Sequence, residues 1–190
     1  MELPNEQTDP RFIHLNRWSF LMMQCFEAAE FLGFAKAEGD GSTDAESKMR
    51  NVLRQQAFFR SFLLSYGKCF ASSGPGRASL DPSKVYAGMA EILKTHNEVM
   101  KFRNKFAAHS DESGLDEAAI RVTEFKDRFE ISHVLSVLTP MGNHSKYTDL
   151  LDALDIYIIT QLNKHLDSLE FKLGKKIRLH EGNQDIDKKE

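Results

Sequence analysis

The sequence predicts an all-α protein, a bundle of four to five helices with a small β-hairpin inserted before the last long helix. Three observations lead to this prediction. Long segments of the chain repeat apolar residues every three or four positions, which is the period of a helix with a buried face. Short polar breaks containing Gly, Pro and Asp separate these segments. Ahead of the last segment, two short stretches alternate apolar and polar residues, as strands do.

Composition supports a folded chain. Of the 190 residues, 41% are hydrophobic, which is enough for a sizeable core, and the length suits one domain. We expect a single helical domain over residues 1–174, followed by a charged and disordered tail over 175–190. The sequence shows neither a signal peptide nor an apolar stretch near the roughly 18 residues of a membrane span, so we expect a cytoplasmic protein.

Charge and cysteine content restrict the chemistry. The net charge is -3 and the pI is about 6.2, so the chain has no general attraction to nucleic acid, and any RNA site must be local. Cys25 and Cys69 lie inside apolar helical runs, and we expect both to be buried, reduced thiols. The histidines are scattered and form no zinc-binding spacing, so we expect neither a metal nor a cofactor.

The first two helices have recognisable start signals. Asp9–Pro10 places a favoured N-cap before a proline at the first helical position. The helix that follows, over 12–36, is apolar on more than one face, and we expect it to be covered on more than one face. Thr43 and Glu46 form a capping-box pattern that starts the second helix. The glycine-rich segment 72–77 ends that helix and is interpreted as a connector.

A third helix and a hairpin follow. Asp81–Pro82 repeats the Asp-Pro start signal, and the third helix is predicted to continue to about Ala108. After a polar loop, segments 120–125 and 129–132 alternate, and a Lys-Asp-Arg turn joins them, which indicates a β-hairpin.

The segment after the hairpin is open to two interpretations. Residues 134–138 can extend the second strand or form a short helix, and the sequence does not decide between them. Pro140–Asn143 then interrupts the chain. The last helix is predicted over 145–173, with its apolar residues on one side.

Arg103 conflicts with the pattern of the third helix. On a wheel of about 100° per residue, Arg103 and His96 fall near the middle of the apolar face. That face consists of Val85, Met89, Ile92, Leu93, Val99, Met100, Phe106 and Ala107. An arginine there is costly to bury unless a partner compensates its charge. Conflicts of this kind concentrate at functional sites, so Arg103 is a candidate site residue.

Structural explanations remain open for the same residues. Arg103 lies near the helix end, where it can extend to solvent or bind terminal carbonyls, and it can also pair with Asp152 or Asp155. His96 is more typical of a core histidine with satisfied hydrogen bonds. His109, at the helix end, is typical of a C-terminal capping residue. The opposite face of the helix is polar, as a solvated surface is, and carries Lys94, Lys101 and Lys105.

The segment Arg103–His109 also resembles a known signature. An arginine, a polar residue directly after it and a histidine six positions on resemble the motif of HEPN proteins. The fuller string, over 102–105 and 108–111, is similar to the helix-three motif of the AbiU2-like group, which is linked to phage abortion. The position of the motif agrees with this resemblance, because it ends a long third helix and precedes a hairpin and a long last helix.

The resemblance implies an activity and roles for individual residues. HEPN proteins with this signature are typically dimeric, metal-independent endoribonucleases, some of them in toxin or phage-defence systems. By resemblance, Arg103 would neutralise the scissile phosphate, His109 would act as general acid or base, and Asn104 would orient either group. The candidate substrate-binding residues are Lys101, Lys105 and Asp111. HEPN toxins silenced by nucleotide transfer carry a tyrosine at the position of Asp111, so that control is not expected here.

Helix geometry leaves one difficulty and one alternative function. On an ideal helix Arg103 and His109 point about 120° apart. They can meet at one phosphate if the helix distorts near Ala107–Ala108, or if two copies pack their third helices together in a homodimer. The alternative is a non-catalytic helical dimer that binds a protein or ligand and keeps the motif as a packing element. The low pI favours this alternative, whereas the intact motif favours the enzyme.

Overall fold

The computed structural model describes residues 12–38, 44–71, 79–108, 116–137 and 140–177. It confirms the expected fold class, because the protein is mostly helical and a two-stranded antiparallel hairpin precedes the last long helix. The elements are α1 (Ile13–Ala37), α2 (Ala45–Phe70), the short α3 (Pro82–Val85), α4 (Ala90–Ala108), β1 (Asp116–Glu124), β2 (Phe129–Val137), the 3₁₀ helix η2 (Met141–Asn143) and α5 (His144–Leu173).

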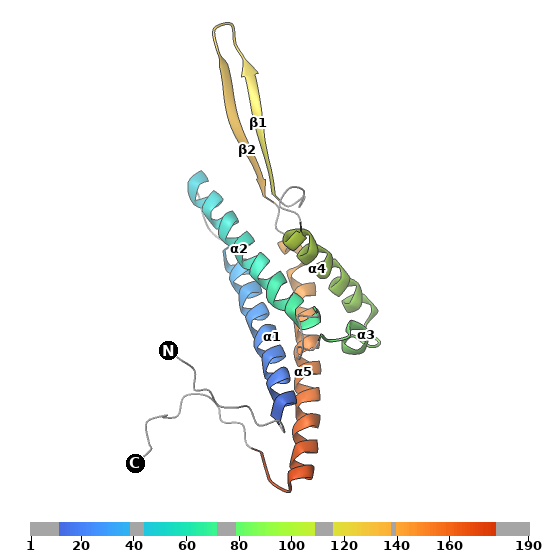
Figure 1. The fold of residues 1–190 in the computed structure, drawn as a ribbon. Helices are drawn as coiled ribbons and strands as arrows, with labels where there is room; N and C mark the ends of the chain where they lie inside the picture. Colours follow the sequence, from blue (N-terminus) through green and yellow to red (C-terminus); the bar gives the residue numbers. More distant parts are fainter. Residues whose placement is uncertain (1–11, 39–43, 72–78, 109–115, 138–139, 178–190) are drawn as a thin grey trace, which may run out of the picture.

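The helices α1, α2 and α5 form the long body of the bundle. α1 packs along α2 on one side and along α5 on the other, and α1 and α5 run in opposite directions (Figure 1). Among the contacts between α1 and α5, Cys25 Sγ lies 3.9 Å from the backbone oxygen of Leu151, and the His14 and His165 rings meet edge to face at 5.8 Å. α4 packs against α2 and α5, so the end of α4 lies on the same side of the bundle as the base of the hairpin (Figure 1).

The core contains aromatic rings from α2 and α5. Phe59, Phe62 and Tyr147 are fully or almost fully buried and meet pairwise at ring distances of 5.6 to 5.8 Å. Aliphatic side chains of α1 and α5 complete this core, among them Leu21, Leu32, Leu150, Leu154 and Ile158. None of the described helices is both long and apolar enough to cross a membrane.

The hairpin projects from the bundle (Figure 1), and its strand register gives it one apolar face. In its register Val122 lies opposite Ile131, and Glu124 lies opposite Phe129. Because directly opposed residues share a face and neighbours alternate, one face carries Ile120, Val122, Phe129 and Ile131. Each of these side chains is more than half exposed. The described part of the chain therefore does not cover this apolar face.

The prediction of one continuous third helix is wrong, because this segment forms two helices. α3 ends at Val85 and α4 begins at Ala90, and Gly88 between them has a φ of 77°. A positive φ is readily adopted by glycine and breaks a helix. The start signal itself is confirmed, since the Ser83 backbone nitrogen donates to Asp81 Oδ1 at 3.0 Å.

Other predicted boundaries move by a few residues. The N-cap of α2 is Asp44 rather than Thr43, and Asp44 Oδ1 accepts from the Ser47 backbone nitrogen at 2.8 Å. Both strands are longer than predicted, and residues up to Val137 continue β2, which decides between the two interpretations of that segment in favour of a strand. Asp9–Pro10, Thr43, the connector 72–77 and residues 178–190 of the predicted tail lie outside the described residues.

Candidate active site

Arg103 lies near the C-terminal end of α4, on the face that packs into the bundle. Val99 and His96 of the same face are buried, with 0% and 4% of their surface exposed. Arg103 itself is half-buried. The sequence pattern therefore placed Arg103 correctly on the packed face of its helix.

The side chain of Arg103 lies directly against the backbone of α2 at Gly67. A Cβ atom built on Gly67 would lie 3.1 Å from Arg103 Cγ, 3.1 Å from Nε and 3.4 Å from Cδ. Distances this short mean that any larger residue at position 67 would have to push the arginine aside. Gly67 was missed by the sequence reasoning. The available signal was a glycine inside a strongly periodic helix, where it costs about 0.8 to 1.0 kcal/mol relative to alanine.

The guanidinium of Arg103 has one hydrogen-bond partner in the described structure. Its Nη1 donates to Asn104 Oδ1 at 3.0 Å, whereas its Nε is buried and has no partner among the described residues. The pairing with Asp152 or Asp155 that the sequence left open is not found within the described residues. Both carboxylates instead act on Cys25, where they help to raise the thiol pKa.

The other proposed site residues have different placements. Lys101 and Lys105 are exposed, and each lies about 160° around the helix from Arg103, so they stand on the opposite face. His109 and Asp111 lie outside the described residues. The structure thus brings Arg103 and Asn104 together, while the convergence of Arg103 with His109 stays a prediction.

His96 belongs to a buried aromatic network, as expected for a core histidine. Its Nδ1 lies 2.6 Å from Tyr66 Oη, which in turn lies 3.0 Å from Tyr86 Oη. The Phe70 ring packs edge-on against His96 at 4.5 Å. Burial lowers the pKa of His96 to about 4, so the ring is neutral at pH 7. His96 therefore has the contacts of a structural residue.

The two cysteines are buried free thiols, as predicted. Burial is the main cause that raises the pKa of Cys25 to about 12, and burial also raises the pKa of Cys69 far above its usual value. Because the thiolate is the reactive form, neither thiol is suited to act as a nucleophile. Within the described ranges, no group of three or more His, Cys, Asp or Glu residues has the arrangement of a metal site.

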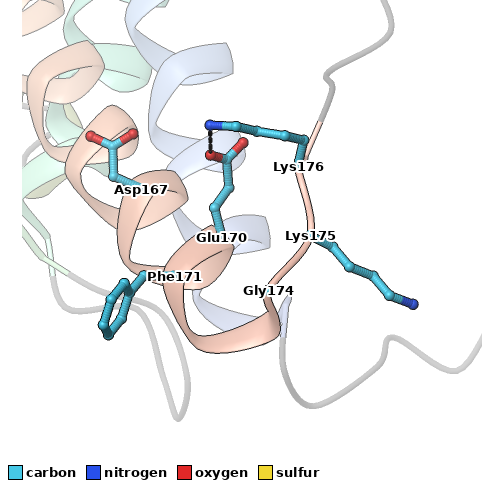
Figure 2. A pocket seen from close by; sticks show the side chains of 6 residues that line it. All are labelled: Asp167, Glu170, Phe171, Gly174, Lys175 and Lys176. Atoms are coloured by element: carbon cyan, nitrogen blue, oxygen red, sulfur yellow. Dashed lines mark hydrogen bonds and ion pairs between the residues drawn. The ribbon is translucent and has the colours of Figure 1, made fainter.

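Two hollows of the described surface lie away from Arg103. One lies at the C-terminal end of α5 and is lined by Asp167, Glu170, Phe171, Gly174, Lys175 and Lys176 (Figure 2). Glu170 accepts hydrogen bonds there from Lys176 Nζ at 2.6 Å and from the Ile177 backbone nitrogen at 2.9 Å. A second lies between α4 and α5, with charged side chains of both signs, such as Glu91 and Lys146. Neither hollow is lined by Arg103 or Asn104.

Comparison with known proteins identified no relative of this chain. No family model matches the chain, and neither a curated protein nor a solved structure matches it significantly. The candidate site therefore rests on its own residues and geometry.

Proposed function

We propose that the protein is a metal-independent endoribonuclease of the HEPN type, acting as a homodimer in a toxin or phage-defence system. One observation carries the proposal. The motif arginine, Arg103, lies on the packed face of α4, is restrained by α2, and hydrogen-bonds to the motif asparagine, Asn104. An arginine restrained in this way loses little freedom when it binds a phosphate, which is a general property of preorganised sites.

The proposed reaction is cleavage of RNA by its own 2′-hydroxyl. His109 accepts the 2′-hydroxyl proton as the oxygen attacks phosphorus, and Arg103 stabilises the charge that builds on the phosphate oxygens. The bond between phosphorus and the 5′-oxygen breaks, that oxygen takes a proton from solvent water, and His109 afterwards releases its own proton to solvent. The products are a 2′,3′-cyclic phosphate and a 5′-hydroxyl. Lys101, Lys105 and Asp111 are proposed to contact the strand beyond the scissile phosphate.

The principal test is cleavage of single-stranded RNA in the presence of a chelator, with identification of the product ends. Loss of a general acid–base group should slow cleavage by about 10² to 10⁴, so His109→Ala should be nearly inactive. Arg103→Ala should also be inactive. Lys94→Ala is the matched control, because it removes one positive charge from an exposed position of the same helix and should keep activity. Cleavage that survives in His109→Ala would contradict the assignment.

A second candidate function is a non-catalytic helical dimer that binds a protein or ligand. The exposed apolar face of the hairpin favours it, because such faces mark association surfaces. Wild-type protein that leaves a broad RNA pool intact, with chelator and with added divalent cations, would support this candidate over the enzyme.

A further inference from the structure

Two glycines inside long helices have opposite surroundings. Gly33 lies within α1, and a Cβ built there would meet nothing within 4 Å. Gly67 lies within α2, and a Cβ built there would meet three consecutive side-chain atoms of Arg103. Both glycines weaken their helices relative to alanine. Only Gly67 makes room for another side chain, so its position has a packing reason that Gly33 lacks.

The contact restrains the stem of Arg103 up to Nε, the atom from which the planar head begins. Cγ, Cδ and Nε lie along the bare backbone of α2, at 3.1 to 3.4 Å from the Gly67 Cβ position. Beyond this contact Nη1 donates a hydrogen bond to Asn104 Oδ1. The contact with α2 and this hydrogen bond together restrict the rotation of the planar guanidinium. Nε is covered, which leaves the terminal Nη atoms as the part of the group that an anion can approach.

We infer that Gly67 is a positioning residue for the Arg103 guanidinium, and that the proposed cleavage requires a residue without a side chain at this point of α2. The inference rests on the proposed function for its catalytic consequence, but the contact itself can be tested without any activity. A Cβ at position 67 would displace the stem of Arg103 by a few tenths of an ångström, and the planar head at its end would tilt.

The first experiment measures the contact by a double-mutant cycle in chemical unfolding. Gly67→Ala should stabilise the Arg103→Ala protein, as a glycine replacement in a helix normally does, but should stabilise the wild type less or destabilise it. The expected coupling between the two changes is roughly threefold or more in the folding equilibrium constant. Gly33→Ala is the matched control, and it should show no coupling with Arg103→Ala. Absence of coupling at Gly67 would overturn the inference.

The second experiment observes the guanidinium itself by NMR. The Arg103 Nε–H signal is identified by its loss in Arg103→Ala. Because Nε is buried, this signal should exchange slowly with solvent in the wild type. Gly67→Ala should shift it and speed its exchange, whereas Gly33→Ala should leave it unchanged. If Gly67→Ala fails to fold, the double variant with Arg103→Ala should fold, which would show that the arginine caused the conflict.

The third experiment links the contact to catalysis. Gly67→Ala should lower kcat by roughly tenfold to 100-fold with a smaller effect on KM, because misplacement of a group mainly affects the transition state. In the Arg103→Ala background it should cause no further loss. A cleaving wild type with Gly67→Ala as active as Gly33→Ala would overturn the positioning role and leave the proposed function standing. A wild type that does not cleave would overturn the proposed function, and the first two experiments would then decide whether Gly67 positions Arg103.

Discussion

At the scale of single residues, α4 carries two polar side chains on its packed face with different roles. His96 is 4% exposed and contacts Tyr66 through its Nδ1. Arg103 lies seven positions later, close to the same direction of the helix, and has a buried Nε without a partner in the described structure. The first residue has the contacts of a structural core group, whereas the second is only half-buried, and its terminal Nη atoms are the part of the guanidinium that an anion can approach. This difference is why Arg103 rather than His96 is the candidate for ligand binding.

We predict that the protein is less stable in mild acid than at pH 7 because of His96. Burial lowers its folded-state pKa to about 4, below the ordinary value of 6.5, so between these values only the unfolded chain binds the proton. The contribution of His96 is fully present above pH 6.5 and is lost as the pH falls toward 4. From pH 7 to pH 5 the free energy of unfolding should fall by roughly 2 kcal/mol through this residue.

The measurement is urea unfolding across this pH range, with His96→Gln as the comparison. The variant should be less stable at pH 7, because it disturbs the contacts with Tyr66 and Phe70, but it should lose less stability between pH 7 and pH 5. The pKa values of His144 and His165 are also lowered by burial, and the variant retains their contribution. An equal pH dependence in both proteins would contradict the prediction.

At the scale of elements, the break between α3 and α4 is a property of Gly88. Its φ of 77° lies in the left-handed region, and a Cβ built there would meet nothing within 4 Å. The break therefore depends on backbone conformation and not on packing at this residue. It allows α4 to leave the direction of α3 and pack against α2 and α5 (Figure 1). This packing brings Arg103 to Gly67.

We predict that Gly88→Ala destabilises the protein by roughly 1–2 kcal/mol, the cost of a left-handed conformation for a residue with a Cβ. Gly88→Asn should cost less, because asparagine adopts this conformation more readily. Gly33→Ala, at a helical position with open space, should instead stabilise by roughly 0.5–1 kcal/mol. Urea unfolding at pH 7 measures all three. A Gly88→Ala protein that gains stability as Gly33→Ala does would show that residue 88 is not left-handed.

At the scale of the whole molecule, the hairpin has an apolar face that the described part of the chain does not cover. Two-stranded hairpins are marginally stable alone, and this one exposes Ile120, Val122, Phe129 and Ile131 on one face. Its other face carries polar residues such as Thr123 and Ser132, so the two faces differ in character. We therefore predict that, in the proposed homodimer, a second copy of the chain packs on this apolar face.

We predict that the wild type is a dimer at micromolar concentration in sedimentation equilibrium, and that Ile131→Lys weakens the dimer. A lysine on the apolar face would require burial of a charge in the interface, which is costly. Ser132→Lys is the matched control, since it places the same charge on the polar face of the adjacent position. Helical circular dichroism should be the same for all three proteins. A monomeric wild type would contradict the proposed homodimer. Equal dimerisation of both variants would show that the hairpin is not part of the dimer interface.

The sequence by itself determined the helical segments, the hairpin and the position of Arg103 on the packed face of α4. These features depend on local periodicity and on start signals such as Asp81, which act within a few residues. Only the tertiary structure decided what Arg103 meets. Gly67 belongs to another helix, and their contact depends on the angle at which α2 and α4 cross and on the break at Gly88. The periodicity of one segment gives neither the crossing angle nor the place of the break. The packing of side chains from several segments sets how helices cross.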